Sequence, residues 1–79
     1  MDFNKVIALN DVYVDLAYAL KGLVYIDIKD YHRAVSSFNE AINITPNDSS
    51  HYINRAYAYD MLGDSEKAEA DRKKADELS

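Results

Sequence analysis

The side chains that could do chemistry are few, and their spacing is unhelpful for catalysis. The chain has two histidines, His32 and His51, and no cysteine. A catalytic or metal-binding histidine needs a second histidine, a cysteine or a pair of acids at matching spacing, and the sequence shows none for either one. We interpret both as surface or turn residues. Ser36 and Ser37 lie on an expected helix with no base within reach. We therefore predict a non-catalytic protein without a metal or cofactor.

The tyrosines are the second chemical possibility. Seven tyrosines could form a stacking platform for bases, as in proteins that bind single-stranded nucleic acid. Four of them, Tyr18, Tyr25, Tyr52 and Tyr59, recur at a fixed interval, which favours packing in a core, whereas Tyr57 is expected on the inner face. The net charge of −5 opposes binding to nucleic acid or anionic lipid, because both require positive counter-charge. A nucleic-acid-associated helical repeat stays an alternative that this charge disfavours.

No targeting or membrane segment is visible. The first five residues do not form a charged segment followed by an apolar one, so no secretory signal is predicted. The most apolar stretch, residues 12–28, is interrupted by Asp15, Lys21 and Asp27 and is too charged for a membrane span. We expect a soluble cytoplasmic chain that does not bind membranes.

The elements that must position these residues follow from an internal repeat. Residue types recur 34 positions apart along most of the chain. A period of this length is typical of one supersecondary unit copied in tandem, each copy covering the apolar face of the last. The matched pairs are Tyr18 with Tyr52, Gly22 with Ala56, Tyr25 with Tyr59, Ala34 with Ala68, and Ala41 with Ala75.

This pattern, with Phe38 and Pro46 added in the first copy, resembles the signature of the tetratricopeptide repeat (TPR) family. The resemblance implies an all-α fold, a right-handed α-solenoid of antiparallel helix hairpins. We expect one domain over residues 1–79. Its parts are residues 1–12, the second-helix half of an incomplete repeat, residues 15–48, a full repeat, and residues 49–79, a repeat with a polar C-terminal cap helix.

Five helices are predicted. They cover residues 3–10, 13–28, 31–44, 49–62 and 65–78, with caps at Asp11, Asp30, Asn47–Asp48 and Asp64. Gly63 ends the fourth helix in the left-handed conformation that glycine adopts easily. Lys29 stands in the equivalent place, where it either costs about 1 kcal/mol or takes another turn.

Three charged residues depart from the family pattern. Lys21 and Arg55 replace an apolar residue, and we expect each to keep its charged head in solvent above an apolar stem. Arg72 replaces the phenylalanine of the second helix. The last helix therefore resembles a polar end-cap that stops further stacking, whereas the N-terminal end has no such cap.

The resemblance implies a concave inner surface, which we predict to be the partner-binding face. One alternative is that its apolar stripe contacts a neighbouring repeat. A TPR subgroup clamps the C-terminal carboxylate of chaperone peptides, but Ala19 and Leu23 stand where it has lysine and asparagine, and only Asn54 matches. An apolar or helical partner segment fits better. The predicted face consists of Leu16, Ala19, Leu20, Leu23, Ile26, Ile53, Asn54, Tyr57 and Asp60.

Two functions follow from these expectations. The first is a protein–protein interaction scaffold that holds a peptide or helix of a partner on the concave face. The second is a self-assembling repeat module, because short arrays have little core of their own. In that case the uncapped N-terminal end would form a homo-oligomer that buries Phe3, Ile7, Leu16, Leu20 and Leu23.

Overall fold

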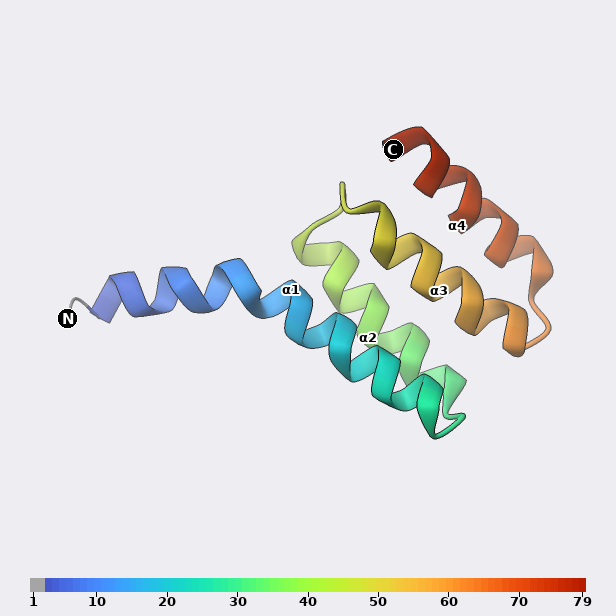
Figure 1. The fold of residues 1–79 in the computed structure, drawn as a ribbon, viewed down its shortest axis with the longest axis horizontal. Coiled ribbons are helices and arrows are strands. Elements are labelled where there is room, and N and C mark those ends of the chain that lie inside the picture. The colour runs from blue at the N-terminus through green and yellow to red at the C-terminus, as the bar shows by residue number, and fades with distance from the viewer. Residues whose placement is uncertain (1–2) are drawn as a thin grey trace.

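A computed structural model describes the backbone of residues 3–79 and the side chains of residues 13–79. It contains four helices: α1 (Phe3–Asp27), α2 (Tyr31–Ile44), α3 (Ser49–Met61) and α4 (Ser65–Leu78), and no strand in that range. Successive helices run antiparallel, and each packs on the next one along the chain (Figure 1). None of the described helices combines the length and the apolar character needed to cross a membrane. The all-α hairpin architecture is therefore confirmed.

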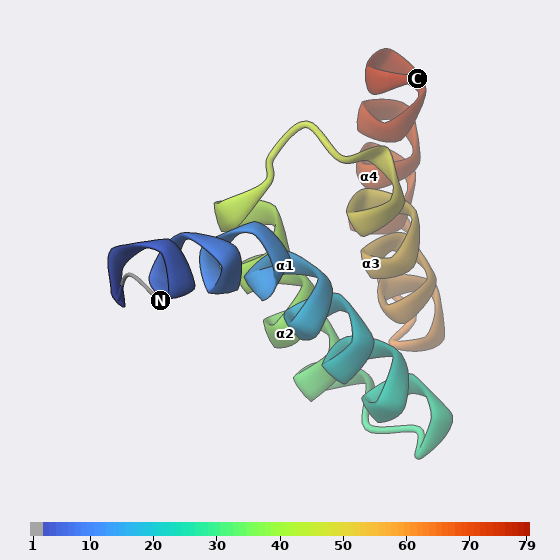
Figure 2. The same ribbon diagram turned by 60° about the vertical axis from the view of Figure 1, so that its left-hand side comes forward.

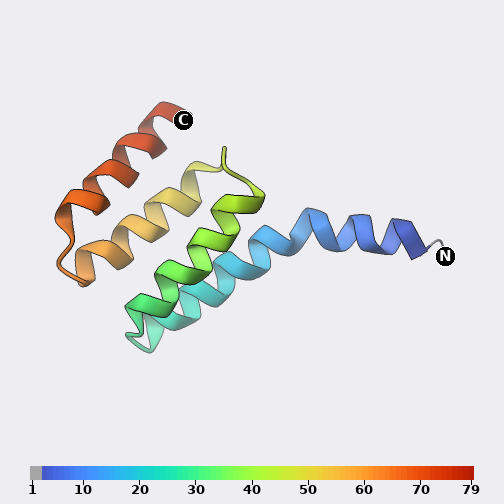
Figure 3. The same cartoon turned by 180° about the vertical axis from the view of Figure 1, so that it is seen from behind.

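The helix count differs from the prediction. The expected break at Asp11 is absent, because residues 3–27 form one continuous helix. No glycine or proline lies near this position, so an aspartate alone does not interrupt the helix. The first half of α1 extends away from the other helices, as Figures 1, 2 and 3 show. Phe3 and Ile7, which we predicted to be buried in a homo-oligomer, lie outside the residues whose side chains the structure describes.

The remaining helix starts agree with the predicted caps. Asp30 accepts a hydrogen bond from the backbone N–H of Arg33 at 3.3 Å, and Asp64 accepts one from Lys67 at 3.2 Å. Asp48 caps α3 by accepting from the backbone N–H of Ser50 at 3.0 Å. Each cap satisfies a donor that a helix start leaves unpaired, which is worth about 1 kcal/mol.

The two hairpin turns have the same geometry although their residues differ. Lys29 has a φ of 65° and Gly63 a φ of 82°. In both turns the following aspartate donates its N–H to a tyrosine carbonyl five residues back, at 2.8 Å in the first hairpin and 2.9 Å in the second. Lys29 therefore adopts the left-handed conformation rather than another turn, because the turn of the hairpin requires a positive φ at this position.

The core lies where α2 meets α1 and α3. Phe38 is fully buried together with Ala34 and Ala58, and Tyr25, Ile26 and Val35 pack against them. The other signature positions take part as predicted. Gly22, Ala41, Tyr52, Ala56, Ala68 and Ala75 are buried, Tyr18 and Tyr59 are half-buried, and the exposed Pro46 accepts a hydrogen bond from the Tyr52 hydroxyl at 2.8 Å.

The tightest contact joins Gly22 of α1 to Phe38 of α2. A Cβ atom at Gly22 would lie 2.5 Å from a carbon of the fully buried Phe38 ring, so the ring would have to shift. The second repeat has Ala56 and Arg72 at the corresponding positions. The first repeat therefore pairs the aromatic Phe38 with a glycine, and the second repeat pairs the flexible Arg72 with an alanine.

We expect Gly22→Ala to lower the free energy of unfolding by about 1–3 kcal/mol, because the new methyl group must displace the Phe38 ring. Without such a contact, alanine in place of a mid-helix glycine stabilises a helix by about 1 kcal/mol. The sign of the change in the free energy of unfolding therefore shows whether the contact exists. Chemical denaturation measures the change. Lys21→Ala, at an exposed neighbouring position, is the control, and an unchanged or raised stability in Gly22→Ala would refute the close contact.

Candidate functional site

The predicted partner-binding residues divide into two groups. Five of them are strongly exposed although they are large and apolar, with exposed fractions between 42% and 64%. They belong to α1 and α3, the first helices of the two hairpins. The exposed five are Leu16, Leu20, Leu23, Ile53 and Tyr57.

The other four predicted residues are engaged within the chain. Ala19 is buried, Ile26 is half-buried against the core, and Asn54 is half-buried. Asp60 accepts a hydrogen bond from Arg72 at 2.6 Å in an exposed ion pair. A partner on this face would therefore meet mainly apolar side chains.

A groove of about 370 Å³ lies between α3 and α4 and includes Ile53. Its lining corresponds, 34 residues earlier, to positions such as Asp15 and Phe38, on which α3 packs. The groove is thus the open counterpart of the surface that receives α3 in the first repeat. Its lining is Ser49, Ile53, Arg72, Ala75, Asp76 and Ser79.

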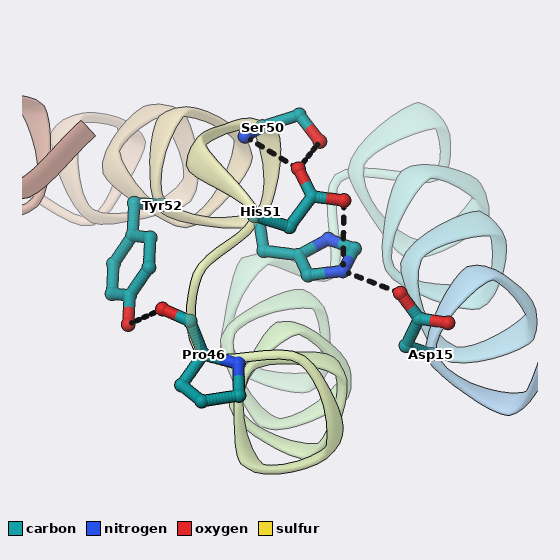
Figure 4. A network of polar contacts seen from close by, with 6 residues as sticks. Asp15, Pro46, Ser50, His51 and Tyr52 are labelled. Carbon is teal, nitrogen blue, oxygen red and sulfur yellow. Dashed lines mark hydrogen bonds and ion pairs between the residues drawn. The ribbon is translucent and has the colours of Figure 1, made fainter. Parts of the chain in front are cut away.

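A buried polar cluster joins the two repeats at the start of α3 (Figure 4). The Nε2 atom of His51 lies 3.1 Å from a carboxylate oxygen of Asp15 on α1 and 3.7 Å from one of Asp48. Only 2% of the His51 side chain and 8% of the Asp15 side chain are exposed. The interpretation of His51 as a surface histidine without a paired acid is therefore wrong.

The sequence signal for this cluster was weak. Asp15 and His51 are 36 residues apart, and nothing in this separation indicates a contact unless the packing of the hairpins is known. Neither residue is part of the repeat, because the positions 34 residues away hold Ser49 and Ala17. Only the N-cap role of Asp48 was predictable from its position before a helix.

Both carboxylates of the cluster favour the charged form. Burial by itself raises the pKa of Asp15, but hydrogen bonds from His51 and Thr45 outweigh it and leave the pKa below its ordinary value. Hydrogen bonds from the side chain and backbone of Ser50 lower the pKa of Asp48. His51 thus lies between two carboxylates that are ionised at neutral pH.

The cluster has the donor set of a cation site, since one imidazole nitrogen and two carboxylate oxygens lie within 4.8 Å of one another. The other ring nitrogen, Nδ1, is buried without a partner. A metal on Nε2 would place the proton on Nδ1 and leave a buried donor unpaired, at a cost of about 1–3 kcal/mol. Donation from Nε2 to Asp15 does not require a proton on Nδ1. The geometry favours a hydrogen-bonded junction, and the absence of a metal stays a prediction.

We expect the free energy of unfolding to fall in acid, because the two carboxylates of this cluster become protonated. Because the pKa of Asp15 and of Asp48 is lower in the folded chain than the ordinary 3.8, their stabilisation is complete above that value and is lost as the pH falls through the folded pKa. Urea unfolding between about pH 6 and about pH 2 measures it. Asp15→Asn should show a shallower acid dependence, and a slope equal to that of the unmodified chain would contradict this account.

A second polar cluster is centred on Arg55 of α3. Its Nε atom donates to one oxygen of Asp71 at 2.8 Å and a terminal nitrogen donates to the other at 2.6 Å, while Asn39 on α2 accepts from the remaining nitrogen at 2.8 Å. The guanidinium lies 5.7 Å from the ring centroids of Tyr52 and Tyr59. The hydrogen bonds to Asp71 raise the pKa of Arg55. The predicted solvated head of Arg55 is therefore wrong.

We expect Arg55→Ala to lower the free energy of unfolding by about 3 kcal/mol, because it leaves the carboxylate of Asp71 buried without its partner. Arg55→Lys should recover only part of this loss, since an ammonium group cannot form the two parallel hydrogen bonds. Arg72→Ala is the matched control and should cost less than about 1 kcal/mol, because its ion pair with Asp60 is exposed. Equal losses in Arg55→Ala and Arg72→Ala would count against a structural role for the Arg55 cluster.

Comparisons with known proteins agree with the repeat pattern. Two family models, both described as tetratricopeptide repeat, match residues 16–48 and residues 37–70. The chain is 36% identical over 70 residues to a Tetratricopeptide repeat protein 36 homolog from Nematostella vectensis, a match that covers 89% of this chain and 39% of the relative. It is 32% identical over 76 residues to Heat shock protein STI1 from Saccharomyces cerevisiae, covering 96% of this chain and 13% of the relative.

No solved structure matches the chain. The chain spans well under half the length of both relatives. The two family matches together extend over residues 16–70, which hold the second half of α1, all of α2 and α3, and the start of α4. The chain therefore belongs to the tetratricopeptide repeat family, with about two repeats.

Proposed function

We propose that this chain is a non-catalytic scaffold that binds a peptide or helix of a partner protein on the concave face formed by its first helices. Membership of the TPR family supports a protein–protein interaction module. The finer assignment, to this face and to this kind of partner, is our proposal. The cytoplasmic location expected from the sequence stays a prediction.

One observation carries the proposal. Leu16 and Leu23 on α1, and Ile53 and Tyr57 on α3, are between 42% and 53% exposed. Large apolar side chains exposed on two helices that contact each other are typical of interaction sites, because water contact with them is unfavourable. The groove beside Ile53 adds a concave seat for an anchoring side chain.

The chemistry of the face indicates the class of partner. An amphipathic helix, or an extended segment with apolar anchors, would match the exposed leucine, isoleucine and tyrosine side chains. A free carboxylate would have few hydrogen-bond donors on this face, because Ala19 and Leu23 supply none and Arg72 is already paired with Asp60. We therefore propose recognition of an apolar segment rather than of a C-terminal carboxylate.

A peptide library displayed on phage tests the proposal directly. Peptides selected on the unmodified chain should be rich in apolar residues, and Leu23→Asp should weaken their binding at least about tenfold, because it places a charge in an apolar contact. Titration with the synthetic peptides by calorimetry measures the affinity. Circular dichroism should show an unchanged melting transition, since Leu23 is 42% exposed.

Ala70→Asp is the matched control. Ala70 is exposed on α4, on a different helix from the proposed face, and its replacement should leave peptide binding unchanged. Selected peptides that bind Leu23→Asp as tightly as the unmodified chain would place the binding surface elsewhere. Peptides that lose affinity when their C-terminal carboxylate is amidated would instead support a clamp.

A further inference from the structure

A second exposed apolar stripe runs along α1 and into its turn. It shares Leu20 with the predicted partner-binding residues, and its other members are not among them. Its members are separated by four, three, four and four residues, so they share one side of a helix. Four of the five are large, with exposed fractions from 60% to 64%. We call this stripe the outer face of α1; it consists of Tyr13, Ala17, Leu20, Val24 and Ile28.

The same surface is covered in the second repeat. The residues 34 positions after Ala17, Leu20, Val24 and Ile28 all belong to the second hairpin, where α3 packs on the first. The outer face of α1 therefore has the form of a repeat interface from which the cover is missing. The covered counterparts, each buried or half-buried, are His51, Asn54, Ala58 and Leu62.

The opposite end of the chain is a poor cover for this face. A head-to-tail contact would bring the groove between α3 and α4 against the outer face of α1. That groove contains Arg72 and Asp76 where the first repeat has Phe38 and Ile42. Covering these charges with leucine and valine would remove them from water, which is unfavourable. Arg72 is in addition already paired with Asp60.

The outer face is instead complementary to itself. Tyr13 and Ile28 lie at equal distances from its centre, as do Ala17 and Val24, and Leu20 lies close to the centre. In an antiparallel pair of α1 helices, a small side chain would thus meet a larger one, and Leu20 would meet its own copy. None of the five members is charged, and the exposed Asp27, seven residues after Leu20, flanks the stripe.

We propose that two copies of this chain form a twofold-symmetric dimer through the outer faces of their α1 helices, packed antiparallel with Leu20 near the axis. A twofold interface uses the same patch on both subunits, and a self-complementary stripe satisfies this requirement. The contact runs for about 22 Å along each helix, so the interface is at the small end of stable ones. The dimer leaves Leu23 and the groove beside Ile53 open, and it does not depend on the proposed partner binding.

Analytical ultracentrifugation of the unmodified chain over a range of concentrations tests the dimer. The mass should rise from one copy to two with concentration. Leu20→Asp should raise the dissociation constant at least about a hundredfold, because it brings two carboxylates together at the axis. Its helicity and melting in dilute solution should stay unchanged, since Leu20 is 64% exposed. Tyr57→Asp, at an exposed position on α3, is the matched control and should dimerise normally.

A single introduced thiol tests the arrangement, because the chain has no cysteine. Leu20→Cys should form a disulfide-linked dimer on oxidation, whereas Ala70→Cys on α4 should not. A chain that stays monomeric at the highest concentration would overturn the proposal and leave the face as the seat of a further repeat or another protein. A dimer that survives Leu20→Asp, or that fails to link through Leu20→Cys, would overturn the antiparallel α1 contact.

Discussion

The close approach of α1 and α2 at Gly22 is the constraint on which the first repeat depends. The Phe38 ring occupies the space that any side chain at Gly22 would need. This lets one aromatic residue reach α1 and α3 at once, with Ala34 and Ala58 around it. In a chain of 79 residues with a small core, this single packing choice aligns both hairpins.

Polar contacts then connect the repeats where apolar area is scarce. The Asp15–His51 pair joins α1 to α3, and Arg55 joins α3 to both α2 and α4. Alanines make up most of the buried apolar residues, so the hairpins bury little area apiece. Buried hydrogen-bonded pairs are directional, and they set the angle between hairpins in a way that alanine packing alone does not.

The two ends of the array differ in chemistry because their outermost helices differ. Near the C-terminal end, α4 carries Arg72, and the groove between α3 and α4 contains Arg72 and Asp76 beside the apolar Ile53 and Ala75. Near the N-terminal end, α1 presents two apolar stripes, one around Leu16 and Leu23 and one around Leu20 and Val24. Under the two proposals, the inner stripe of α1 holds a partner and the outer stripe a second copy.

The 34-residue period by itself determined the hairpins, their caps and the buried small residues, because these depend on local spacing and on turn chemistry. It did not predict the continuous α1, since whether Asp11 caps or continues a helix depends on its surroundings. It also missed the buried roles of His51 and Arg55, whose partners Asp15 and Asp71 lie on other helices. Only the stacked hairpins decided those contacts, because burial and pairing of a polar side chain depend on which helices meet around it.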